Sequence, residues 1–222
     1  MDLRYRCLIL DHDDTVVNST AVVHHPAYLD AVEKLRPGSH LEMSLSEYFQ
    51  INCDPGFMAY MEKVMKLSEE EIAKEYEIWQ SWVRRIVPEV YPGMKRIILH
   101  QKEEGGFVCV SSHSVDFNIR RDYRAAGLPE PDLVFGWELP KEQRKPSVFA
   151  VDAILERLHL ERKDILMVDD LKPGWEMAEA AGIDFAWAGW AHQVPSIEEF
   201  MEKNASFCFR NPEKLEAFLF ET

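Results

Sequence analysis

Short apolar runs alternate with longer amphipathic segments along most of this 222-residue chain, and this alternation limits the possible folds more than any other feature. The apolar runs are rich in β-branched and aromatic residues, which is typical of strands covered on both faces. We expect strands at 6–10, 106–110, 132–135, 164–168, 184–188 and 206–209. Helical patterns lie between them at 93–104, 116–126, 146–158, 173–181, 195–203 and 212–220. The chain is therefore predicted to be an α/β protein with a three-layer, Rossmann-like parallel sheet core.

Residues 16–91 interrupt this alternation, because they contain several helical stretches and no convincing strand. The longest helix is expected to begin after Ser68, since Ser68 and Glu71 have the spacing of a capping box. An apolar stripe with helical spacing follows at Ile72, Tyr76, Trp79, Val83 and Ile86. We predict that 16–91 form a small all-helical cap domain, the helical insertion, within a catalytic core made of 1–15 and 92–222.

Charge and apolar content exclude some classes of partner. The formal net charge of −14 argues against nucleic acid and anionic membrane surfaces, which select for an excess of Lys and Arg. The first apolar stretch is too short for a signal peptide or a membrane span, and no longer one follows. The cysteines lack metal-binding spacing, so buried reduced thiols are the favoured interpretation. We expect a cytoplasmic protein that is a monomer or a homodimer.

The sharpest motif is Asp11-His12-Asp13-Asp14-Thr15, which places three carboxylates at the end of an apolar strand. Acids this close repel one another and lose solvation, so the arrangement is costly unless a cation lies among them. Capping a turn needs only one Asp or Asn, and a purely structural role therefore explains the motif poorly. Ligands of open parallel sheets bind beyond the carboxyl ends of the strands. Asp11 and Asp13 are predicted to stand at such a site.

Polar groups also follow two other predicted strands, Ser111-Ser112-His113-Ser114 and Asp169-Asp170. Three strand ends would then converge on one crevice. Acids from different strands supply oxygen ligands for Mg²⁺, hydroxyl groups suit phosphate oxygens, and a carboxylate can attack phosphorus. A cation facing the phosphate could come from Lys145 at the start of a helical pattern, although Lys141 and Arg144 lie close to it in the sequence.

The order and spacing of these motifs resemble those of the haloacid dehalogenase-like superfamily. Asp-x-Asp-x-Thr at 11–15, Ser111 after the second strand, Lys145-Pro146 and then Asp169-Asp170 follow in the family's order. The similarity extends over nearly the whole chain. It implies a Rossmann-like core, a cap that closes over the crevice and selects the substrate, Mg²⁺ as cofactor and a small phosphorylated metabolite as substrate.

The resemblance also implies a role for each matching residue. Asp11 becomes the nucleophile that forms an aspartyl phosphate, and Asp13 the general acid/base. Asp11, the backbone carbonyl of Asp13 and Asp170 would hold Mg²⁺, with Asp169 outside the inner ligand shell. The phosphate would be bound by Ser111, Ser112 and Lys145.

Two positions depart from the commonest family pattern. Asp14 stands where Gly is usual and adds a third acid near the metal, and Gly174 stands where many relatives carry another acid. Further substrate contacts could come from His24 in the cap and His113 after the second motif. Trp190 and His192 follow the fifth strand and could reach the same edge of the sheet.

A Mg²⁺-dependent phosphatase is the leading functional hypothesis. The presence of Asp13 disfavours dehalogenation, because a halide leaves without a proton whereas an ester oxygen needs one. A phosphomutase similar to β-phosphoglucomutase would use the same aspartyl phosphate and pass it to a sugar, and the sequence leaves this open. A non-catalytic sensor of a phosphorylated ligand is less favoured, because Asp11 and Asp13 are both present.

Overall fold

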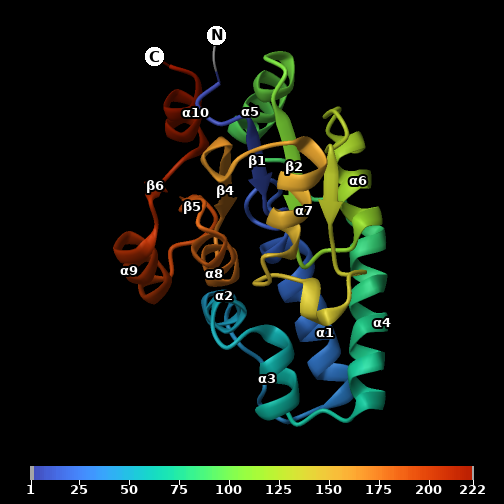
Figure 1. The fold of residues 1–222 in the computed structure, drawn as a ribbon. Helices are drawn as coiled ribbons and strands as arrows, with labels where there is room; N and C mark the ends of the chain where they lie inside the picture. The colour runs from blue at the N-terminus through green and yellow to red at the C-terminus, as the bar shows by residue number, and fades with distance from the viewer. Residues whose placement is uncertain (1–2, 222) are drawn as a thin grey trace.

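The computed structural model describes residues 3–221, and its centre is a six-stranded parallel sheet with helices on both faces (Figure 1). The strands are β1 (Cys7–Leu10), β2 (Phe107–Ser111), β3 (Leu133–Phe135), β4 (Ile165–Asp169), β5 (Asp184–Ala188) and β6 (Phe207–Phe209). Their order is β3-β2-β1-β4-β5-β6. Each strand begins and ends within one residue of its predicted bounds, which confirms the predicted sheet.

Two hydrophobic clusters, one on each face of the sheet, hold the three layers together. The helices that cover the sheet are α5 (Pro92–Glu103), α6 (Asp116–Ala125), α7 (Phe149–Leu158), α8 (Lys172–Ala181), α9 (Pro195–Asn204) and α10 (Pro212–Phe220). Successive strand residues face opposite sides. Cys7 and Ile9 of β1 therefore pack with α7, α8 and α9, whereas Leu8 and Leu10 pack with α5, α6 and α10. The three-layer α/β prediction is confirmed.

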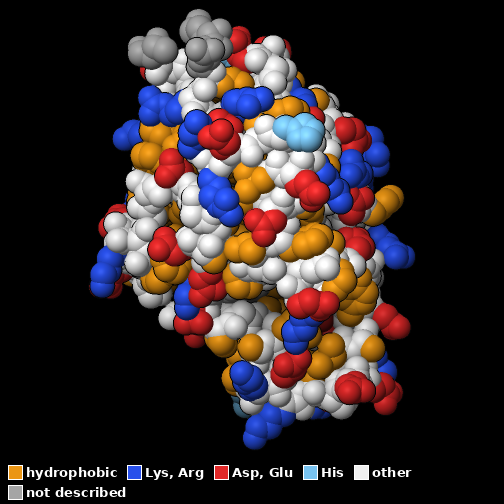
Figure 2. Space-filling model, viewed as in Figure 1, with side chains coloured by type: hydrophobic (Ala, Val, Ile, Leu, Met, Phe, Trp, Pro, Cys, Tyr) orange, Lys and Arg blue, Asp and Glu red, His pale blue; other side chains and the backbone are white. Residues whose placement is uncertain are grey.

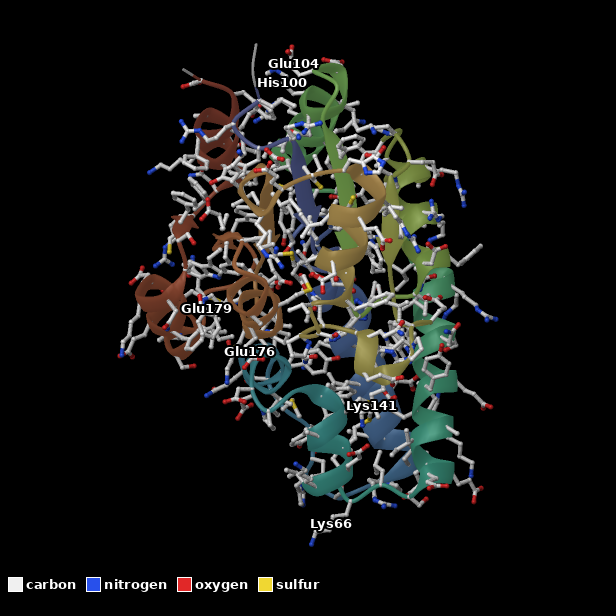
Figure 3. All side chains as sticks on the ribbon, in the orientation of Figure 1. Lys66, His100, Glu104, Lys141, Glu176 and Glu179 are labelled. Carbon is white, nitrogen blue, oxygen red and sulfur yellow. The ribbon has the colours of Figure 1, made fainter. Side chains whose placement is uncertain are left out.

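The helical insertion lies beyond the carboxyl ends of the strands (Figure 1). It contains η1 (Thr20–His24), α1 (His25–Leu35), α2 (Leu45–Cys53), α3 (Phe57–Lys63) and α4 (Glu69–Arg85). A third hydrophobic cluster, centred on Tyr28, Val32 and Tyr48, is its own core. Lys66, between α3 and α4, marks the end of the insertion farthest from the core, and His100 and Glu104 lie at the opposite end of the molecule (Figure 3).

Helix α4 begins where the sequence predicted, and Val83 of the predicted stripe is buried, but one position of the stripe differs from the expectation. Ser68 accepts from the backbone N–H of Glu71, and the Glu71 side chain accepts from the N–H of Ser68, which completes the capping box. Tyr76, predicted to be in the apolar stripe, is 38% exposed, whereas Glu75 is buried. Because α4 packs along α1, the position of α1 decides which residues of α4 are covered.

Two chain segments connect the insertion to the core and pair with each other. The N–H of Asn18 donates to the carbonyl of Glu89 (2.9 Å), and that of Tyr91 donates to the carbonyl of Val16 (2.9 Å). Val16 is buried within the core cluster of α5, α6 and α10. The division of the chain at 16 and 91 stays a prediction.

Helix α6 of the core also contacts the carboxyl end of α4. The Arg121 guanidinium donates to the carbonyls of Val83 and Ile86. Asp122 binds the same guanidinium (2.7 Å) and also contacts His12 Nε2 (3.1 Å). The loop after β1 is thereby connected to the end of α4 through α6.

The surface shown in Figure 2 has acidic and basic side chains interspersed, without a large patch of one sign on that face. Over residues 3–221, no helix combines the length and the apolar character that crossing a membrane requires. Cys7 and Cys109 are buried neighbours on β1 and β2, as expected. Cys208 is exposed, contrary to expectation, because it lies on β6, a short strand at the edge of the sheet.

Candidate active site

The site begins where the two central strands end. Leu10 of β1 pairs with Val168 of β4, and the N–H of Asp11 continues the ladder to the carbonyl of Val168 (2.9 Å). Because the strands are parallel and in register, Asp11 and Asp169 emerge side by side. Both are buried, and Asp170 follows directly. The two acidic strand ends singled out in the sequence are therefore brought together.

Lys145 joins the two acidic strand ends. Its Nζ lies 2.7 Å from Asp11 Oδ1 and 2.6 Å from Asp169 Oδ2, and its side chain is only 5% exposed. Burial alone would lower the pKa of Lys145, but the two carboxylates outweigh it and raise the pKa above its usual value. The ammonium group is thus held charged beside Asp11.

Lys141 and Arg144, the two cationic residues close to Lys145 in the sequence, have other surroundings. Lys141, labelled in Figure 3, is exposed, and Arg144 donates to the carbonyl of Leu139 (2.7 Å). One prediction about Lys145 is wrong, since it does not stand at the start of a helix. Helix α7 begins at Phe149, because the residues before it belong to the loop that brings Lys145 to Asp11 and Asp169.

Asp11, Asp169 and Asp170 each present an oxygen atom within 4.8 Å of the others. The two oxygens of Asp169 are occupied by Lys145 and by the N–H of Leu171 (2.8 Å). Among the described residues, the Asp170 side chain accepts only a long hydrogen bond from Thr15 Oγ1 (3.4 Å), and its Oδ2 accepts none. Burial, and next the Asp169 carboxylate, raises the pKa of Asp170 well above its usual value. Such a set of hard oxygen donors fits a divalent cation such as Mg²⁺.

Asp13 points toward the helical insertion. His24 Nε2 donates to Asp13 Oδ1 (2.9 Å), and Ser19 Oγ donates to the same oxygen (2.8 Å). Burial alone would raise the pKa of Asp13, but His24 outweighs burial and holds this pKa below its usual range. His24, a predicted candidate from the cap, therefore contacts the predicted acid/base itself. His25 points elsewhere and contacts the carbonyl of Met43 (2.8 Å).

The two departures from the family pattern have local explanations. Asp14 has a positive φ of 60°, a conformation that favours Gly but that Asp tolerates. Its carboxylate accepts from the N–H of Thr20 (3.2 Å), so Asp14 also holds the start of η1. At Gly174, an added Cβ would lie 2.2 Å from Asp169 Oδ2. A side chain at 174 would therefore displace the carboxylate that binds Lys145.

Ser111 is the last residue of β2, and the other polar residues of this motif lie in the loop that follows. Ser111 and Ser112 are buried, and Ser112 Oγ accepts from the N–H of Ser114 (3.1 Å). His113 Nε2 is 3.1 Å from the backbone carbonyl of Lys145, so it can donate to that carbonyl. This contact connects the loop after β2 with the loop that carries Lys145.

The residues after β5 contact the acidic strand ends. Trp190 Nε1 donates to the carbonyl of Thr15 (3.2 Å). His192 Nε2 lies 3.7 Å from Asp170 Oδ2, and its ring packs on Phe49 of α2. Burial lowers the pKa of His192 to about 4, so the ring is neutral. The sequence pattern placed Trp190 and His192 at this edge of the sheet. Their contacts are with the acidic loops that follow β1 and β4.

Sequence reasoning missed the role of Trp79, which it treated only as a packing residue. Its indole N–H donates to His24 Nδ1 (2.9 Å). The amphipathic pattern shows that such a residue is on a helix face, but it carries no information about a partner 55 positions away.

The fold and the site define a Rossmann-like α/β protein with a lysine-bridged acidic centre at the strand ends. The sequence profile of the haloacid dehalogenase-like hydrolases matches residues 8–188, and the chain belongs to this family. No curated protein matches the sequence.

Solved structures with the same fold cover nearly the whole chain. A predicted phosphoglycolate phosphatase from Haemophilus somnus 129PT has 16% identity and a TM-score of 0.75, with 97% of this chain and 98% of that chain covered. A haloacid dehalogenase-like hydrolase from Bacteroides fragilis has 14% identity and a TM-score of 0.77, over 95% and 99%. CbbY from Rhodobacter sphaeroides, determined with xylulose-1,5-bisphosphate, has 16% identity and a TM-score of 0.71, over 95% and 96%. At these identities the likeness shows the fold.

Proposed function

We propose that this protein is a Mg²⁺-dependent phosphatase that hydrolyses a small phosphorylated metabolite through an aspartyl phosphate on Asp11. The observation that carries the proposal is the bridge from Lys145 to Asp11 and Asp169, next to the open carboxylate of Asp170. A cationic group against a buried carboxylate suits the attack of that carboxylate on a phosphate dianion, because it offsets the repulsion between them.

The binding roles follow from charge and position. Mg²⁺ held by Asp11, the backbone carbonyl of Asp13 and Asp170 would neutralise charge on the phosphate. Lys145 would face a phosphate oxygen while it keeps Asp169 in place. The hydroxyl groups of Ser111 and Ser112 would donate to the remaining phosphate oxygens.

The reaction has two proton-balanced steps. In the first, an Asp11 oxygen forms a bond to phosphorus, the ester P–O bond breaks, and Asp13 gives a proton to the leaving oxygen. Asp13 must be protonated for this step, although His24 keeps its pKa low in the free site. In the second, water attacks the phosphorus, the Asp11–phosphorus bond breaks, and Asp13 takes a proton from the water. Asp13 thus acts first as acid and then as base.

The substrate class is supported by the family and by the phosphorylated ligand of the Rhodobacter protein. The interspersed surface charges and the net charge of −14 favour a small substrate over a polyanion.

The proposal is tested by phosphate release from p-nitrophenyl phosphate with Mg²⁺ or with EDTA. Wild type should turn over only with the metal, and Asp11→Asn should lose at least about a thousandfold in kcat. Asp152→Asn, which changes an exposed carboxylate on α7, should keep full activity. Acid-quenched wild type should carry a phosphoryl group on the Asp11 peptide by mass spectrometry. Metal-independent turnover, or turnover by Asp11→Asn at the wild-type rate, would contradict the proposal.

A further inference from the structure

A hydrogen-bonded chain runs from helix α4 to Asp13. The Trp79 indole N–H donates to His24 Nδ1 (2.9 Å), and His24 Nε2 in turn lies 2.9 Å from Asp13 Oδ1. The rings of His24 and Trp79 are stacked, with centroids 6.1 Å apart and 20° between their planes. The side chains of His24 and Asp13 are 12% and 23% exposed. The contact between His24 and Asp13 is thus largely shielded from water that could replace it.

The chain has a direction, because an indole N–H can only donate. The bond from Trp79 requires a neutral His24 ring whose Nδ1 carries a lone pair, so the ring hydrogen is on Nε2, where it points at Asp13. In the other tautomer, the Nε2 lone pair would face the ionised Asp13 carboxylate and the two would repel. The hydrogen bond from Trp79 therefore determines whether His24 Nε2 donates a hydrogen bond to Asp13 or repels it.

We propose that Trp79 is a positioning residue that fixes the tautomer of His24 and thereby orients Asp13 for proton transfer to the leaving group. The inference rests on the proposed function, because it assigns the acid/base role to Asp13. It gives the helical insertion a part in the reaction step, since Trp79 lies on α4 and His24 on η1.

Trp79→Phe tests this directly, because it keeps an aromatic ring beside His24 and removes the N–H donor. Trp82→Phe is the matched control. Trp82 is on the same helix and donates its indole N–H to Asp30 Oδ2 (3.0 Å), which is outside the chain that leads to Asp13. Both variants lose one indole hydrogen bond of α4, so a general effect on the helix appears in both.

The readout is the dependence of kcat/KM on the leaving group. An alkyl phosphate needs a proton on its departing oxygen, whereas p-nitrophenolate leaves without one. Trp79→Phe should lower kcat/KM by about tenfold or more for the alkyl phosphate and by less than about twofold for p-nitrophenyl phosphate. Trp82→Phe should change both by less than about twofold. Equal losses on the two substrates, or no loss, would overturn the proposal.

A second substitution separates the tautomer from other effects of Trp79. His24→Gln places an amide N–H near Asp13 and has no ring tautomer to select. In that background, Trp79→Phe should cost less than about twofold on the alkyl phosphate. A full loss there would show that Trp79 acts by another route and would overturn the inference.

Ring ¹⁵N NMR tests the tautomer without activity. Wild type and Trp82→Phe should show His24 protonated on Nε2, and Trp79→Phe should show a mixture. An Nδ1-protonated ring in wild type overturns the inference even if the enzyme is active. If wild type hydrolyses neither substrate, the proposed function fails, and the NMR result decides the positioning of His24 by itself.

Discussion

Glu75 is a carboxyl group buried in the helical insertion, and no described residue forms a hydrogen bond or an ion pair with it. It is 8% exposed, and burial raises its pKa to about 7 from a usual value of 4.5. The charged form is therefore disfavoured in the folded protein, and near neutral pH Glu75 costs stability. The free-energy cost of burying Glu75 should therefore change with pH.

Between about pH 4.5 and 7, the folded state keeps a proton on Glu75 that the unfolded state has lost. The free energy of unfolding therefore falls as pH rises through this window, by at most about 3 kcal/mol. Glu75→Gln removes the charge and should be more stable than wild type by up to about 3 kcal/mol at pH 8, with no difference near pH 4. Urea unfolding at several pH values measures this.

Glu77→Gln is the control, because Glu77 is exposed on the same helix. Its difference from wild type should be the same at every pH. If Glu75→Gln gave an equally flat difference, the burial of Glu75 would not be the cause of any change in stability.

The capping box of α4 is a feature of a whole element, because it satisfies N–H groups that no residue within the helix can reach. Ser68→Ala removes the side-chain acceptor for the Glu71 N–H and should lower the free energy of unfolding by about 1 kcal/mol. Ser81→Ala, in the exposed part of α4, removes only a hydroxyl bonded to the carbonyl of Ile78 and should change it by less than about 0.5 kcal/mol. Urea midpoints compare the two, and equal losses would argue against a special role of the cap.

Elements with local signals could be predicted from the sequence, and elements placed by distant contacts could not. The strands and the α4 cap depend on residues close in the chain, so their predicted bounds agree with the structure. The start of α7 at Phe149 and the exposure of Tyr76 were mispredicted. The first depends on a loop that carries Lys145 to Asp11, and the second on the placement of α1 against α4.

The candidate site divides in the same way. Asp11 and Asp169 were predictable because parallel strands in register bring their carboxyl ends to one edge. The contact between Trp79 and His24 could not be foreseen, since it requires α4 to lie against η1. The orientation of Asp13 therefore depends on tertiary structure that no local pattern encodes.

At the scale of the whole molecule, the acidic centre proposed to bind Mg²⁺ also lowers the stability of the metal-free protein. Asp11, Asp169 and Asp170 lie together with Lys145 as the one cation bonded to them among the described residues. Asp170 Oδ2 accepts no hydrogen bond there, and a buried carboxylate oxygen without one is costly. A bound divalent cation would offset this cost, so the global stability of the protein should respond to Mg²⁺.

Asp170→Asn should separate the two effects. Without metal, the variant should be more stable than wild type by roughly 1–3 kcal/mol, because it removes a buried charge. Mg²⁺ at about a hundred times its Kd should stabilise wild type by about 2.7 kcal/mol, which corresponds to a rise in Tm of roughly 5–10 °C for a chain of this size. The variant should show little or no rise.

Asp152→Asn, at the exposed carboxylate on α7, should behave as wild type with and without Mg²⁺. Thermal unfolding in EDTA and in Mg²⁺ measures all three proteins. An undiminished Mg²⁺ response in Asp170→Asn would place the ion elsewhere, whereas a metal-free variant less stable than wild type would mean that Asp170 is held by contacts stronger than its long bond to Thr15. The opposite signs expected for the two effects make the result specific: the same carboxylate should weaken the metal-free fold and be required for its stabilisation by the cation.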